Sequence, residues 1–328
     1  MKRRSMAWLA LGLLSGSLPA GADTVDIREW LVPWEDSMPA AACVAPGGRV
    51  WFAGTKGDFI ANFSQDSAEF NRYDLRKGTA PIALLVDRDS NLWFASHRRR
   101  LIGMLNPATG RVAEYEMPER KAKDLRSLAF DQNGDIWFTV EDGNYIGRIT
   151  PGRQQIALVT VPVKNTRPFG IAVDPRNEPW VAASGRNALL HVDPATMSVV
   201  QIDTPNEDSR PRRLVITLSG QVWYADYALG RLGRYDPARQ EFSEWPMPGG
   251  DTSMPFGMAL DRNDRIWLVE TGHIPNRLVG FDTGTESFLT ETDIPSGAGS
   301  VSDLFYFEPA GEIWFGTESN YVGRAKVH

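Results

Sequence analysis

The sequence has little cysteine, little histidine and no excess of basic charge. Its 328 residues include one cysteine, Cys43, so an intrachain disulfide framework is excluded. There are 35 Lys and Arg against 41 Asp and Glu, and this net charge of −6 argues against a nucleic-acid partner held by phosphate contacts. The four histidines leave few bases that titrate near neutral pH. The rest of the composition, 42% hydrophobic and 23% charged, excludes global disorder, collagen and coiled coil.

The first residues form a leader pattern. Basic residues 2–4 precede an apolar stretch over residues 6–18, and Ala20-Gly21-Ala22 supplies the small side chains of a cleavage site. The alternative, a membrane anchor, needs roughly 20 apolar residues, and this stretch is shorter. We therefore predict a signal peptide over residues 1–22, cleaved after Ala22, and a periplasmic or secreted product of residues 23–328. No later segment is apolar enough to span a membrane.

Seven tryptophans recur at a nearly constant spacing. Each follows an apolar or proline residue and precedes an aromatic or aliphatic one, and consecutive copies lie 42 to 47 residues apart. They are Trp51, Trp93, Trp137, Trp180, Trp223, Trp267 and Trp314. A period of this length is typical of a repeat architecture. We expect these side chains to pack between repeats rather than to stack on a ligand, and we expect Cys43 to be a buried small hydrophobe.

Each repeat reads as four short strands. An apolar strand such as residues 168–173 precedes turn residues, and the tryptophan strand follows. A third strand, such as residues 145–149, and a fourth that ends in proline, such as residues 112–118, complete the unit. Four strands in about 43 residues predict a propeller blade. The sequence therefore indicates an all-β fold, a single seven-bladed β-propeller.

The last repeat has only three strands before the chain stops. The missing fourth strand is found at residues 25–33, which end in proline like the other fourth strands. We predict that this N-terminal strand completes the last blade beside the strands between about residues 299 and 326, which removes an exposed sheet edge. No linker breaks the period, so residues 23–328 are one domain rather than two.

The repeated unit resembles the streptogramin (virginiamycin B) lyase family. The resemblance rests on Pro-x-Gly-Ile-Ala-Val-Asp at residues 168–174, Ile-Trp-Phe-Thr at 136–139 and Ile-Gly-Arg-Ile at 146–149, and it extends over all seven units. It implies a carbon–oxygen lyase that opens a cyclic depsipeptide antibiotic by elimination at its ester, which gives antibiotic resistance. It also implies assistance by Mg²⁺, a catalytic Glu after one tryptophan strand, and catalytic His residues on two successive blades.

The family's functional positions are only partly matched. The Glu position is Glu270, and the two His positions are Arg212 and Phe256. Phenylalanine cannot titrate and arginine stays protonated, so both differences remove the base that elimination needs. His273 follows Glu270 by three residues, which leaves Glu270 and His273 as the catalytic candidates.

First strands begin, and tryptophan strands end, at the same face of a blade. The residues at those positions should therefore ring one mouth of the central channel and form a binding site for a small molecule. The candidate ligand-binding residues are Arg126, Phe169, Arg212, Asp226, Phe256 and Asp303. Three carboxylates, Asp226, Glu270 and Asp303, are candidate ligands for Mg²⁺ or Ca²⁺. The alternative for Arg212 and Asp226 is a structural ion pair within their own blade.

Three functions remain open. The first is an exported, monomeric propeller that binds a small molecule or a partner at the channel mouth. Arg212 and Phe256 occupy its two His positions, which argues against the family's lyase activity. The second is a virginiamycin B lyase-type elimination assisted by Mg²⁺. The third is a non-catalytic periplasmic propeller that docks protein partners. A lactonase-type hydrolase is disfavoured, because that fold has six blades and this sequence has seven repeats.

Overall fold

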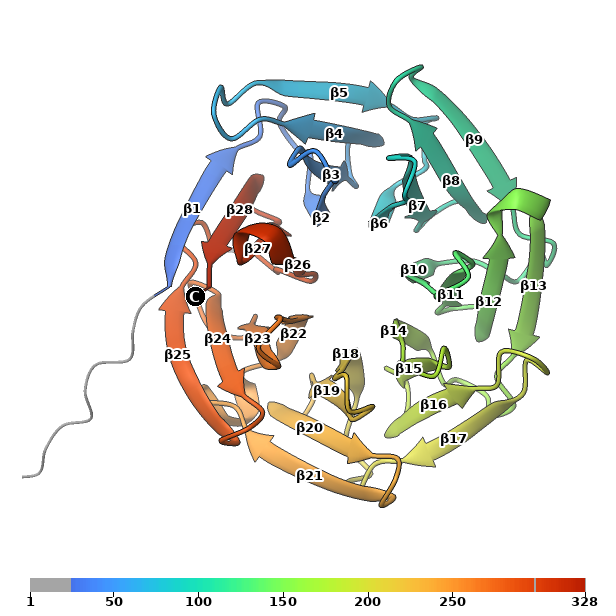
Figure 1. Cartoon of the computed structure of the whole chain (residues 1–328), viewed down its shortest axis with the longest axis vertical. Coiled ribbons are helices and arrows are strands. Elements are labelled where there is room, and N and C mark those ends of the chain that lie inside the picture. Colours follow the sequence, from blue (N-terminus) through green and yellow to red (C-terminus); the bar gives the residue numbers. More distant parts are fainter. Residues whose placement is uncertain (1–24, 298, 328) are drawn as a thin grey trace, which may run out of the picture.

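The computed structural model describes residues 25–297 and 299–327, and these form seven four-stranded antiparallel sheets arranged in a ring (Figure 1). The predicted seven-bladed propeller is confirmed. The predicted signal peptide over residues 1–22 lies outside the described residues. Within the described part of the chain, no helix is long and apolar enough to cross a membrane.

The strands follow one another blade by blade, and each blade runs from the channel outward. Blade one holds β2 (Pro39–Val44), β3 (Val50–Gly54), β4 (Phe59–Phe63) and β5 (Phe70–Asp74). Blade two holds β6 (Pro81–Val86), β7 (Leu92–Ser96), β8 (Leu101–Asn106) and β9 (Arg111–Glu116). Blade three holds β10 (Leu125–Phe130), β11 (Ile136–Val140), β12 (Tyr145–Thr150) and β13 (Gln155–Thr160). Blade four holds β14 (Pro168–Val173), β15 (Pro179–Ala183), β16 (Ala188–Val192) and β17 (Val199–Asp203).

The remaining three blades complete the ring. Blade five holds β18 (Pro211–Ile216), β19 (Val222–Asp226), β20 (Arg231–Asp236) and β21 (Glu241–Pro246). Blade six holds β22 (Pro255–Leu260), β23 (Arg265–Glu270), β24 (Arg277–Asp282) and β25 (Ser287–Asp293). Blade seven holds β26 (Phe305–Phe307), β27 (Glu312–Gly316), β28 (Tyr321–Lys326) and β1 (Asp26–Leu31). Three short 3-10 turns connect strands: η1 (Pro151–Arg153), η2 (Gly250–Thr252) and η3 (Glu308–Ala310).

The repeat tryptophans are packing residues, as expected. All seven are at most 3% exposed. In several blades the indole N–H donates to an aspartate that directly follows the first strand, as Trp137 does to Asp131 at 3.1 Å. The same carboxylate accepts the backbone N–H groups of Asn133 and Asp135, so it holds the connecting turn and the tryptophan together. This explains why Asp, a turn and Trp recur at one spacing. Cys43 is fully buried, and burial raises the pKa of its thiol.

Glycine recurs in the third strands because an aromatic ring from the second strand covers it. A Cβ added at Gly147 would lie 2.1 Å from Cζ of Phe138, and one at Gly233 would lie 2.1 Å from Cζ of Tyr224. No side chain larger than hydrogen fits beneath these rings without a shift of the neighbouring strand. The recurrent glycine is therefore a packing requirement of the blade.

We expect Gly147→Ala to lower the free energy of unfolding by about 1 to 3 kcal/mol, because the new methyl group overpacks a close-packed sheet. Urea denaturation followed by tryptophan fluorescence measures the change. Gly152→Ala is the matched control, since a Cβ at Gly152 meets no atom within 4 Å. Equal stability of the two variants would contradict this reading of the glycine.

The ring is closed by the N-terminal strand. β1 pairs with β28 in antiparallel register from Asp26 opposite Lys326 to Leu31 opposite Tyr321, and Figure 1 shows it on the outer edge of that blade. The Trp30 ring packs 5.7 Å from Trp314 and 5.1 Å from Phe63. The predicted closure is confirmed, and β28 does not end the sheet as an open edge.

Blade seven differs from the others at the channel. Its first strand, β26, begins at Phe305, two residues after Asp303. The preceding segment is held instead by blade six, because the Val301 carbonyl accepts the N–H of Gly257 and the Val301 N–H donates to the side chain of Asn276. Asp303 therefore precedes the strand that the repeat spacing predicts it to open.

Candidate functional site

The channel mouth is built where each first strand meets the end of the second strand. The register pairs Pro211 with Asp226 in blade five and Pro255 with Glu270 in blade six. Directly after this pair the register shifts in the first strands of blades one to six. In blade five Arg213 already pairs with Ala225, so Arg212 falls in the shift. A bulge of this kind re-aims the side chain of the extra residue.

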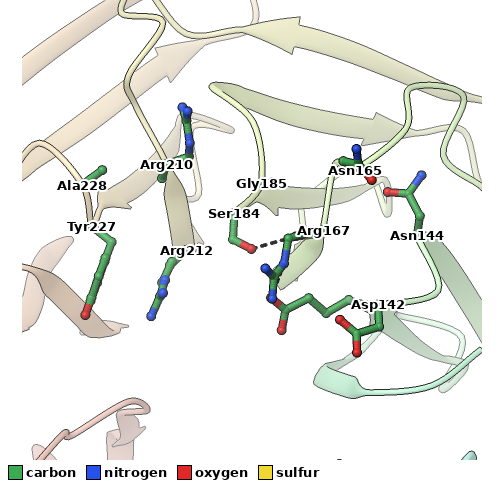
Figure 2. Close-up of a pocket in the computed structure, with 11 residues that line it drawn as sticks. Asp142, Asn144, Asn165, Arg167, Ser184, Gly185, Arg210, Arg212, Tyr227 and Ala228 are labelled. Atoms are coloured by element: carbon green, nitrogen blue, oxygen red, sulfur yellow. Dashed lines mark hydrogen bonds and ion pairs between the residues drawn. The ribbon is translucent and has the colours of Figure 1, made fainter.

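A cavity of about 630 Å³ lies at this mouth over blades three to five (Figure 2). Its walls come from the loops that follow β11, β15 and β19 and from the segments that enter β14 and β18. The lining residues are Glu141, Asp142, Asn144, Asn165, Arg167, Ser184, Gly185, Arg210, Arg212, Tyr227 and Ala228. Of the residues predicted from the sequence, Arg212 lines this cavity.

Arg212 is half-buried within a group of aromatic rings. Its guanidinium carbon lies 3.7 Å from the ring centroid of Tyr227, 5.0 Å from that of Phe256 and 5.8 Å from that of Phe169. The two phenylalanine rings are 5.7 Å apart. Burial lowers the pKa of Arg212 from its ordinary value, and the neighbouring Tyr227 and Glu141 oppose that shift. An arginine so placed stays charged, and the ring faces stabilise it through cation–π contacts.

Glu141 lies between two other arginines of the mouth. Its carboxylate accepts from Arg126, which lies in β10, and from Nε of Arg167 at 2.8 Å, just before β14. Arg126 also donates to Asp124 at 2.8 Å, and Asp124 contacts Nδ1 of His97 in blade two. Charges thus alternate along the mouth from blade two to blade four. Glu141 lies one residue, and Asp124 and Arg167 lie two residues, outside the positions that the repeat register singles out, so the sequence analysis missed them.

The channel below the mouth is crossed by an arginine that the sequence analysis also missed. Arg213 makes an ion pair of 3.3 Å with Asp303, donates to the carbonyl of Ser302 at 3.1 Å and donates to the hydroxyl of Ser127 at 3.2 Å. These partners belong to blades seven and three, on other sides of the channel. Burial raises the pKa of Asp303, while Arg213 acts in the opposite direction. Asp303 therefore pairs with Arg213 inside the channel and does not line the cavity at the mouth.

Comparison with known proteins places this geometry in a family. The model of the virginiamycin B lyase family matches residues 21–192 of the sequence. This chain belongs to the virginiamycin B lyase family. The resemblance seen in the sequence is therefore confirmed, and the mouth can be compared with what the family implies.

Solved structures of family members share the fold. A streptogramin B lyase has a TM-score of 0.83 and 21% identity, over 93% of this chain and 98% of that one. Selenomethionine-substituted virginiamycin B lyase from Staphylococcus aureus has a TM-score of 0.84 and 22% identity, over 93% and 100%. A catalytically inactive variant of that lyase, solved with quinupristin, has a TM-score of 0.83 and 22% identity over the same shares. A comparison with curated proteins finds no match.

The residues present do not fit the Mg²⁺ site that the family implies. Within residues 25–297 and 299–327, no group of three His, Cys, Asp or Glu side chains is placed to hold a metal ion. The candidate ligands Asp226, Glu270 and Asp303 each have other partners. Oδ1 of Asp226 accepts the backbone N–H groups of Arg210, Ala228 and Leu229, which closes the loop after β19. The structure does not bring the three predicted carboxylates together, because the repeat spacing places them on one face but not toward one point.

Asp226 does not pair with Arg212 either. Its second oxygen, Oδ2, is buried and accepts no hydrogen bond from the residues that the structure describes. Arg212 lies against Tyr227 instead. Arg212 and Asp226 therefore do not form the alternative ion pair within blade five. Loop amides donate to the carboxylate of Asp226, and aromatic rings pack on the guanidinium of Arg212.

Glu270 and His273 do not act on a common point. Glu270 is fully buried at the end of β23 and accepts from Nε of Arg277 at 2.8 Å and from the N–H of Gly249 at 2.7 Å. Nδ1 of His273 lies 2.8 Å from the carbonyl oxygen of Pro275, in the loop between β23 and β24. Glu270 thus joins strands within blade six. His191 packs on Trp180, with ring centroids 4.4 Å apart, and has no part in the mouth.

Proposed function

We propose that this protein binds a small molecule in the cavity at its channel mouth and does not carry out the family's elimination. One observation carries the proposal. Both positions at which the family implies a catalytic histidine, Arg212 and Phe256, form an aromatic–guanidinium group, and Arg212 lines a cavity of about 630 Å³. This volume lies within the roughly 300 to 1,000 Å³ of typical small-molecule sites, and the lining is largely polar, with Tyr227 as its aromatic side chain.

The chemistry of the mouth supports binding over elimination. Elimination needs a base within reach of the proton that leaves, and neither a guanidinium nor a phenyl ring supplies one. The matching carboxylate, Glu270, is engaged by Arg277 and the Gly249 amide. The other carboxylates predicted to hold Mg²⁺ are also engaged, Asp226 by loop amides and Asp303 by Arg213.

The leader pattern extends the proposal to location. Residues 1–22 have the basic start, the apolar stretch and the small residues of a signal peptide. We infer that the product acts as a monomer in the periplasm or outside the cell, where it meets ligands that do not enter the cytoplasm. The observation that favours a small molecule over a protein partner is the cavity itself, since its lining is concave.

Ring opening tests the absence of elimination. Purified protein is incubated with virginiamycin B and Mg²⁺, and the antibiotic is followed by its chromatographic retention, because elimination at the ester leaves the mass unchanged. We expect the same retention as in a blank without protein. Conversion of many equivalents of antibiotic would overturn this part of the proposal and establish the lyase alternative.

A fragment screen by ligand-observed NMR tests binding at the mouth. We expect hits whose signals are lost in Ala228→Trp, because Ala228 is exposed, lines the cavity and contributes only a methyl group. The indole would fill the cavity without removing a contact of the fold. Hits that persist unchanged in Ala228→Trp, or no hits, would contradict a binding site at the mouth.

A further inference from the structure

We propose that the ligand of the mouth carries a carboxylate next to an aromatic or aliphatic group, and that Arg212 binds this carboxylate. The inference rests on the proposed function and narrows it to a chemical class. Figure 2 shows Arg212 and Tyr227 side by side, with their polar ends directed the same way, whereas Arg210 extends in the opposite direction.

The guanidinium of Arg212 has donors to offer. An arginine carries five N–H groups and no acceptor, and in a half-buried position these groups need partners. Across the described residues, no carboxylate lies within ion-pair distance of Arg212 and no side chain or carbonyl accepts from it. The nearby Tyr227 ring covers a face of the guanidinium at 3.7 Å. Stacking on a face leaves the N–H groups at the edge directed outward, and this is the geometry that receives a carboxylate through two parallel hydrogen bonds.

The surrounding charges favour an anion. Two acids line the cavity: Glu141 is bound by both Arg126 and Arg167, and Asp142 is exposed to solvent, so neither forms an ion pair with Arg212. Arg210 has no acidic partner in the described part of the chain, because its side chain donates to the carbonyls of Glu207 and Ser209. The cavity lining therefore holds three arginines, Arg167, Arg210 and Arg212, against two acids, a local excess of one positive charge, although the whole chain carries −6. A local field of this sign raises the concentration of anionic ligands at the mouth.

The number of free donors points to a single negative charge. Arg126 and Arg167 are held by Glu141, and Arg210 by loop carbonyls, which leaves Arg212 as the guanidinium whose donors face the cavity. One guanidinium balances the single charge of a carboxylate, whereas a phosphate dianion, which the same planar fork can also bind, keeps a second charge that a further cation must balance. The ring of Tyr227, which lines the cavity and packs against Phe256, supplies an apolar surface for the rest of the ligand. A monocarboxylate with a hydrophobic group can bind both the guanidinium of Arg212 and the aromatic surface beside it.

A matched pair of probes tests the class. N-acetyl-L-phenylalanine and its uncharged amide are titrated into the protein by ligand-observed NMR at low ionic strength. We expect the acid to bind at least about tenfold more tightly than the amide, because a hydrogen bond to a charged partner is worth at least that factor. We also expect this preference to shrink as salt is added. Inorganic phosphate at the same concentration should compete less well than the acid.

Variants assign the preference to one residue. Arg212→Met should abolish the difference between acid and amide, and Arg212→Lys should keep only part of it, since an ammonium lacks the planar fork. Arg210→Met is the matched control, because Arg210 lines the same cavity but bonds to its own loop; it should retain most of the preference and lose only the contribution of its charge to the local field. Glu141→Gln should strengthen binding of the acid, because it releases Arg126 and Arg167. Circular dichroism of each variant shows that the fold is intact.

The outcomes separate the two proposals. Equal affinity of acid and amide, tighter binding of phosphate, or a preference that survives Arg212→Met would overturn the carboxylate assignment and leave the mouth as a binding site. Binding of both probes that persists in Ala228→Trp would overturn the binding site itself. Loss of the preference for the acid in Arg212→Met, with its retention in Arg210→Met, supports both the binding site at the mouth and the carboxylate assignment.

Discussion

Replacing Glu270 by alanine is expected to lower the free energy of unfolding by about 3 to 5 kcal/mol, the cost of removing one partner from a buried ion pair. Glu270 is fully buried and holds the guanidinium of Arg277 and the backbone N–H of Gly249. Alanine leaves both donors without that acceptor. Arg277 retains its second ion pair with Glu291, so the loss lies toward the lower end of this range. Urea denaturation followed by circular dichroism measures it.

A paired variant separates structure from function at this position. Because two buried charges can be exchanged for apolar groups of similar size at little cost, Glu270→Met combined with Arg277→Met should recover most of the stability lost in Glu270→Ala. Binding at the mouth should be unchanged in the paired variant. A Glu270→Ala protein of full stability that has lost binding would show instead that Glu270 acts on the ligand, as the family implies.

Removing the closing strand is expected to have the second large effect. A chain that lacks residues 1–33 should lose about 5 kcal/mol or more, which approaches the whole stability of many domains. It loses Trp30, which packs against Trp314 and Phe63, and the carboxylate of Glu29, which accepts hydrogen bonds from the backbone N–H and the hydroxyl of Ser296. It also exposes the edge of β28, and we expect association at high concentration. Thermal unfolding and light scattering measure the two consequences.

The matched control for this deletion lacks residues 1–24 and keeps β1. It should melt at the temperature of the full chain, because the closing strand begins at Asp26. Trp30→Ala should fall between the two, with a loss of about 3 kcal/mol. Equal melting temperatures of the two truncated chains would contradict a stabilising role for β1.

The fold could be predicted almost completely from the sequence, because its pattern is local and repeated. One buried tryptophan per blade, bonded in several blades to an aspartate six residues before it, sets the period. The fourth strand of the last blade was found at the other end of the chain, because its final proline matches the other fourth strands. The start of β26 was misplaced, because Val301 is held by contacts with blade six that no repeat reveals.

The site was predictable only in part, since its side chains meet across blades. The repeat register identifies Arg212, Phe169 and Phe256, and the structure brings these three together. The repeat register does not predict the ion pairs of Glu141 with Arg126 and Arg167, because these pairs depend on side-chain conformations in two blades. The partner of Glu270 was hidden by the six-residue loop that separates it from Arg277. Simple alternation along β18 also fails to place Arg213, because the bulge changes which residue faces the channel.

The bulges that follow the first residue of the channel strands have a consequence for how such propellers diversify. The residue in the bulge is unpaired in the ladder, so its replacement costs no inter-strand hydrogen bond, yet its side chain stands at the mouth. Six blades have such unpaired residues, one in blades two and five and two in each of the others, and a side chain there can change without loss of a ladder pair. Position 212 is an example, because the family implies a histidine there and this chain has Arg212. A library randomised only at these bulge positions would sample new ligand specificities while the folding determinants stay untouched.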